Sequence, residues 1–166
     1  MREFVLAIGL VALASCATRY ESSISGPTAT VTFSASGIRT GAWVLVQNFS
    51  SESCQPSRNG TRLATFTTTT VQGKGDPHSG VSRVMPAGQP AIITFAYQAG
   101  AMGFTDTETC TISQTFVPEA GGRYQVQFDQ TPSMCYVSVM REEAGVSTRV
   151  PDARSVKPAC VDKLSG

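Results

Sequence analysis

The 166-residue chain is poor in the side chains on which most enzymes depend. It has one histidine, no Gly-x-Ser-x-Gly nucleophile elbow and no Cys-x-x-Cys pair. The histidine, His78, lies in a stretch rich in Gly and Pro (72–80) that predicts a loop, and a loop positions a catalytic base poorly. The sequence therefore predicts a protein that is not an enzyme, with no catalytic residue, metal site or cofactor.

The chain also has almost no net charge. The chain has 13 Lys and Arg against 12 Asp and Glu, without a cluster of basic residues. Nucleic-acid binding usually needs such a cluster, so no nucleic-acid partner is expected. Two acidic pairs could serve a carboxylate enzyme, Asp106 with Glu108 and Glu142 with Glu143, but both lie in stretches typical of solvated surface.

The apolar run near the start of the chain is too short to span a membrane. It extends over 11 residues, from Phe4 to Ala14, whereas a transmembrane helix needs about 20. The run follows Arg2 and precedes small residues, which is typical of a secretory signal peptide. The sequence therefore predicts export.

The end of this segment reads Leu13-Ala14-Ser15-Cys16 and resembles the lipobox of bacterial lipoproteins. The resemblance implies that residues 1–15 are a signal peptide and that Cys16 becomes the amino terminus, with lipid on its sulfur and an acyl chain on its amine. Two or three chains hold a protein in a membrane almost permanently. In Gram-negative lipoproteins a residue other than Asp after the Cys, here Ala17, implies the outer membrane, facing the periplasm.

Four cysteines remain when Cys16 is set aside: Cys54, Cys110, Cys135 and Cys160. An even number of thiols in an exported domain predicts two disulfides. Zinc is disfavoured because no two of the four lie close together in the sequence. Of the three possible connectivities, strand order favours Cys54 with Cys110 and Cys135 with Cys160.

Short β-rich runs separated by turn residues dominate the chain after residue 27. Residues 16–27 are small and polar and predict a flexible lipidated tether, and residues 28–166 predict a single antiparallel β-sandwich of about eight strands. Trp43, in a run that is apolar on both faces, is the expected core anchor. The runs that begin at Thr109, Arg123 and Cys135 are expected to form a meander. The eight runs are 28–34, 43–49, 62–71, 92–97, 109–117, 123–129, 135–141 and 146–150.

The stretch from Phe116 to Tyr124 contains Pro118, Gly121 and Gly122. It resembles the turn that opens a late strand in immunoglobulin-like and transthyretin-like sandwiches. A Tyr after such a turn can bury its ring while its hydroxyl bonds back to the loop, as in a tyrosine corner. The resemblance implies this architecture alone, without functional residues.

Two loops are the expected functional surface, because loops on a rigid sandwich often carry binding. They cover residues 73–80, with His78, and 98–106, with Met102 and Phe104. The favoured function is a non-enzymatic binding or assembly module in the periplasm with a protein partner. The alternatives are an inhibitor of a hydrolase, such as a lysozyme or a protease, and an enzyme that uses carboxylates.

The lipid anchor can be tested directly at Cys16. Cells grown with radiolabelled palmitate are expected to label the wild-type chain and not the Cys16→Ser variant, because serine has no thiol to form the diacylglycerol thioether. Label retained by the variant would contradict the anchor.

Overall fold

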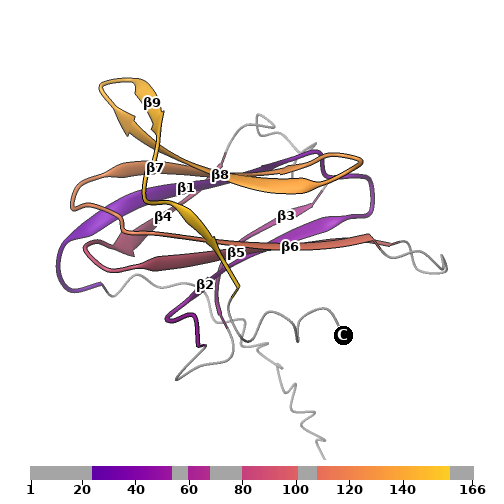
Figure 1. Cartoon of the computed structure of the whole chain (residues 1–166), viewed down its shortest axis with the longest axis horizontal. Helices are drawn as coiled ribbons and strands as arrows, with labels where there is room; N and C mark the ends of the chain where they lie inside the picture. Colours follow the sequence, from indigo (N-terminus) through magenta and orange to yellow (C-terminus); the bar gives the residue numbers. More distant parts are fainter. Residues whose placement is uncertain (1–23, 54–59, 68–79, 101–107, 158–166) are drawn as a thin grey trace, which may run out of the picture.

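The computed structural model describes residues 24–53, 60–67, 80–100 and 108–157 (Figure 1). Their regular structure is entirely β, and no helix in these ranges is long and apolar enough to cross a membrane. Ten strands form two five-stranded sheets, which confirms the all-β class. The first sheet has the order β4-β1-β7-β8-β9, and the second has the order β10-β6-β5-β2-β3. The strands are β1 (Thr28–Ser36), β2 (Trp43–Phe49), β3 (Thr61–Thr67), β4 (Val81–Pro86), β5 (Ala91–Ala99), β6 (Glu108–Phe116), β7 (Arg123–Gln130), β8 (Cys135–Glu143), β9 (Val146–Arg149) and β10 (Arg154–Val156).

The two sheets share one apolar core, seen edge-on as two layers in Figure 1. Aromatic rings from both layers meet in it. The ring centroid of Phe95 on β5 lies 5.7 Å from that of Phe128 on β7 and 6.4 Å from that of Phe33 on β1. Side chains on β7 alternate as the sequence predicts, with Tyr124, Val126 and Phe128 buried and the residues between them exposed.

Each predicted run overlaps one strand, and two of the described strands were not predicted. The sequence of β4 gave a weak signal because Arg83 interrupts it and Pro86 ends it. The other, β10, has only three residues. The expectation of a wholly antiparallel sandwich is wrong at one pair: β1 runs parallel to β7, from Thr30 opposite Arg123 onward.

Two further expectations are corrected. The meander is wrong, because β6 belongs to the second sheet while β7 and β8 pair in the first. Alternation shows which face of a strand is buried, but not which sheet it joins. Trp43 is not the core anchor: it is half-buried, while Val44 and Val46 point into the core. Both faces of β2 are apolar, so its pattern could not show which face is inward.

A disulfide joins Cys110 on β6 to Cys135 on β8 and so links the two sheets. Both pairings expected from strand order are therefore wrong, since each used one of these cysteines. β6 and β8 lie in different sheets that pack against each other, so Cys110 and Cys135 can meet across the core. The expected meander placed both strands in one sheet. Cys54 and Cys160 lie outside the described residues.

The turn between β6 and β7 forms the predicted tyrosine corner. The Tyr124 side chain is 3% exposed, and its hydroxyl oxygen accepts a hydrogen bond of 2.9 Å from the backbone N–H of Glu119. The ring lies so close to Gly122 that a Cβ there would approach it to 2.6 Å, and Gly121 has a φ of 73°. The turn therefore needs glycine at both positions.

The same turn holds two other segments of the chain. The Gly121 N–H donates to the carbonyl of Thr28, at the start of β1, over 2.7 Å. The Gly88 N–H, between β4 and β5, donates to the carbonyl of Pro118 over 2.8 Å. This end of the sandwich is thus tied together by backbone hydrogen bonds.

Tyr124→Phe is expected to lower the free energy of unfolding by about 1–2 kcal/mol, because the Glu119 N–H loses its acceptor. Tyr136→Phe is the matched control: Tyr136 is 47% exposed, so its change is expected to stay within about 0.5 kcal/mol. Denaturant unfolding measures both. Equal effects would show that the Tyr124 hydroxyl does not stabilise the turn.

Candidate functional site

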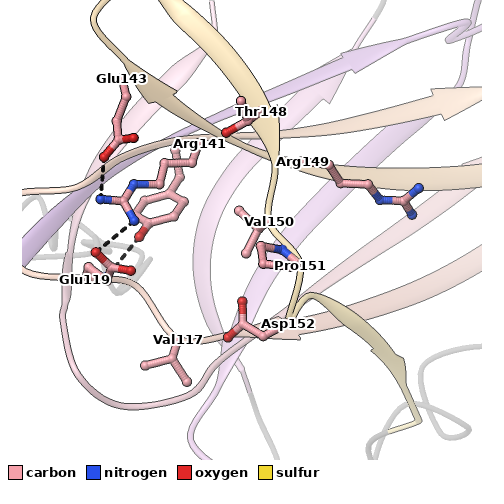
Figure 2. Close-up of a pocket in the computed structure, with 10 residues that line it drawn as sticks. Val117, Glu119, Arg141, Glu143, Thr148, Arg149, Val150, Pro151 and Asp152 are labelled. Carbon is pink, nitrogen blue, oxygen red and sulfur yellow. Dashed lines mark hydrogen bonds and ion pairs between the residues drawn. The ribbon is translucent and has the colours of Figure 1, made fainter.

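A cavity of about 460 Å³ opens at one end of the sandwich (Figure 2), and we call it the end cavity. Two connections between the sheets border it: the turn from β6 to β7, and the segment from β9 to β10. Strands β7, β8 and β9 supply the other walls. Its lining residues are Val117, Glu119, Tyr124, Arg141, Glu143, Thr148, Arg149, Val150, Pro151 and Asp152.

Strand β8 brings charged side chains into this end. Alternate residues of the strand share a face, so Arg141 and Glu143 continue the face that carries Val137 and Val139. Exposure increases along that face, from buried valines to a half-buried Arg141 and an exposed Glu143. The inward face of the first sheet thus changes from apolar to charged where it reaches the end cavity.

Arg141 links the two sides of the end cavity. Its Nη1 lies 2.8 Å from Oε2 of Glu119, and its Nη2 lies 2.8 Å from Oε1 of Glu143, as Figure 2 shows. Desolvation lowers the pKa of Arg141, but the hydrogen bond that its guanidinium donates to Glu119 and the charges of both carboxylates outweigh this effect, so the pKa is raised. The guanidinium stays charged and connects β8 to the turn between β6 and β7.

The β8–β9 hairpin forms the exposed rim of the site and extends beyond the layered sheets in Figure 1. Glu143 pairs with Val146, leaving a two-residue turn of Ala144 and Gly145. Both have positive φ, 48° and 80°, as in the type I′ turn that suits twisted hairpins. All four residues of β9 are exposed, and Val146 is 60% exposed.

The end cavity gathers three carboxylates from separate elements: Glu119, Glu143 and Asp152. Two of them, Glu119 and Glu143, each use one oxygen to hold Arg141. No cluster of His, Cys, Asp or Glu that could hold a metal ion occurs in the part of the chain that the structure describes. The arrangement is suited to binding a complementary group.

Of the two acidic pairs singled out in the sequence, only Glu142 with Glu143 lies wholly within the described residues, and these two side chains lie on opposite faces of β8. Glu142 lies 3.4 Å from Arg123, whereas Glu143 engages Arg141 on the opposite face of the strand. Glu108 engages Arg39 at 2.9 Å. Its expected partner, Asp106, lies outside the described residues.

The other predicted site residues divide into two groups. Cys16, His78, Met102 and Phe104 lie outside the described residues. Cys110 and Cys135 are bonded to each other, with Cys135 at the start of β8 and the end cavity at the strand's other end.

Sequence reasoning missed Arg141, Glu119 and Asp152. A signal for Arg141 was present, because an arginine two residues after Val139 occupies the apolar face of an alternating strand. Glu119 and Asp152 carried no such signal, since both lie in connections that only the fold brings together.

No protein-family model matches the chain, and searches of curated proteins and of solved structures found no match.

Arg141→Met is expected to loosen the β8–β9 hairpin, because Glu143 and Glu119 would lose their shared cation. Amide hydrogen exchange of residues 141–149 should accelerate several-fold, while the core strands β5 and β7 change little. Arg149→Met is the matched control, since the Arg149 side chain points away from the end cavity (Figure 2). Equal exchange in both variants would mean that Arg141 does not hold the hairpin.

Proposed function

We propose that this chain is a non-enzymatic binding module, held at the outer membrane by lipid on Cys16 and presented to the periplasm. The observation that carries the binding role is an exposed hairpin with a fixed turn beside a cavity of mixed polarity. Pockets of 300–1,000 Å³ that combine apolar walls with a few polar groups are typical of binding sites. The partner is proposed to be a protein.

The chemistry of the end cavity favours binding over catalysis. A carboxylate enzyme needs one acid free to donate a proton and another free to act as base or nucleophile. Glu119 and Glu143 instead share the guanidinium of Arg141. Only Asp152 among the three carboxylates of the cavity is outside this ion-pair network.

The start of β1, which the proposed tether precedes in the sequence, lies at the same end of the domain as the site. The carbonyl of Thr28 accepts a hydrogen bond from the N–H of Gly121, in the turn that also contains Glu119. Residues 16–27, if extended, reach about 40 Å at ~3.3 Å per residue. A tether of this length would keep the end cavity within reach of partners in or near the membrane.

An inhibitor of a lysozyme or protease is the second candidate. It is favoured by the β8–β9 hairpin, because a convex element with a fixed turn can enter an active-site cleft. The tip presents Val146, with Ala144 and Gly145 held in left-handed conformations.

Two disulfides in the domain remain a prediction, with Cys54 and Cys160 as the thiols available for the second.

A photo-crosslinking amino acid at position 146 of the full, membrane-anchored chain tests the binding role. We expect it to crosslink one recurring protein, because the hairpin is the proposed contact. The same amino acid at position 84 is the control: Val84 is 42% exposed but lies on β4, at the opposite edge of the first sheet.

The same products at both positions, or none at position 146, would contradict the proposal. Adding the chain to lysozymes and proteases separates the two candidates. Inhibition that Val146→Lys abolishes would favour the inhibitor, whereas a recurring crosslink without inhibition would favour the assembly module.

A further inference from the structure

The end cavity carries an excess of negative charge. Three carboxylates line it, from Glu119, Glu143 and Asp152, and one guanidinium, that of Arg141, forms ion pairs with two of them. Arg149 also lines the cavity, but its side chain is directed away from it in Figure 2. A negative potential in a concave site attracts a cation and repels an anion.

Two of the three carboxylates are paired with a cation, and the third is not. Glu119 and Glu143 turn toward Arg141, whereas Asp152 lies apart from them in Figure 2. Asp152 is exposed and takes part in none of the ion pairs found among the described residues. Its charge is therefore available to a ligand, as are the second oxygens of the two glutamates.

Apolar surface lies beside these charges. Val117 is 40% exposed, and Pro151 is also exposed, while Val150 is buried behind them. The Thr148 hydroxyl stands on the hairpin side (Figure 2). A ligand that fits both surfaces needs a cationic head on an aliphatic stem.

We propose that the end cavity binds an alkylammonium group, supplied by a lysine side chain of a partner protein. The ammonium would lie near Asp152, and the methylene stem would cover Val117 and Pro151. A lysine side chain commonly buries its stem on apolar surface and keeps its charge in a polar setting. An arginine fits less well, because its planar fork is suited to bidentate pairing with one carboxylate. Only the assignment to a protein partner rests on the proposed function.

Titration of the ¹⁵N-labelled full chain at low ionic strength tests this site. The first probe is Nα-acetyl-lysine methylamide, which keeps the side-chain ammonium. The second is its norleucine counterpart, which has a stem of similar length without the ammonium, and the third is 1,5-diaminopentane. We expect the lysine probe to shift amides of residues 117–119 and 148–152 saturably, and the norleucine probe to leave them unchanged. Stronger binding of the lysine probe than of the diamine supports a protein side chain, whereas the reverse order would overturn that source.

Two single-charge variants separate direct contact from general attraction. Asp152→Asn is expected to weaken binding of the lysine probe at least threefold. Glu142→Gln removes the same charge from the same end of the domain, but Glu142 faces away from the cavity and pairs with Arg123. It should weaken binding much less.

Equal weakening by both variants, or equal shifts from the lysine and norleucine probes, would overturn the proposed site. Such a failure is distinct from failure of the binding role. The crosslink at position 146 depends on the hairpin and not on an ammonium in the cavity, so it would persist.

Discussion

The turn between β6 and β7 is the constraint on which the rest of this structure depends. Here the chain leaves one sheet and enters the other. A single residue, Glu119, takes part both in the packing of the turn and in the support of the β8–β9 hairpin. The backbone N–H of Glu119 bonds to the buried Tyr124 hydroxyl, while its carboxylate holds Arg141. A change that displaces the turn would therefore disturb the packing at this end of the core and the support of the β8–β9 hairpin together.

Strand β8 connects the two ends of the sandwich. Near its start, Cys135 is bonded to Cys110 of the opposite sheet, and near its end Arg141 is paired with the turn. The strand is thus fixed covalently at one end and by charge at the other. A hairpin that continues from a strand held in this way can be exposed along all of β9 and still keep one shape. This combination of exposure and order is what a protein-binding element requires.

The local features of the fold were predictable, and its long-range features were not. Alternation around Val126 identified β7, and the glycines before Tyr124 identified the tyrosine corner, because both patterns depend on neighbouring residues. The parallel pairing of β1 with β7 and the Cys110–Cys135 bond join segments far apart in the sequence, so no local period encodes them. The end cavity follows from these pairings, which is why Asp152 carried no signal.

The charge of the end cavity follows from how Arg141 is held. One guanidinium can neutralise one carboxylate, yet its position on β8 places it between Glu119 and Glu143. The group of Arg141, Glu119 and Glu143 that holds the hairpin to the turn therefore keeps a residual negative charge, to which Asp152 adds. The stabilising interaction and the proposed recognition of a cation thus have the same physical origin. A partner that brings its own ammonium would complete the charge balance that the fold leaves open, and would do so at the end of the domain where β1 begins.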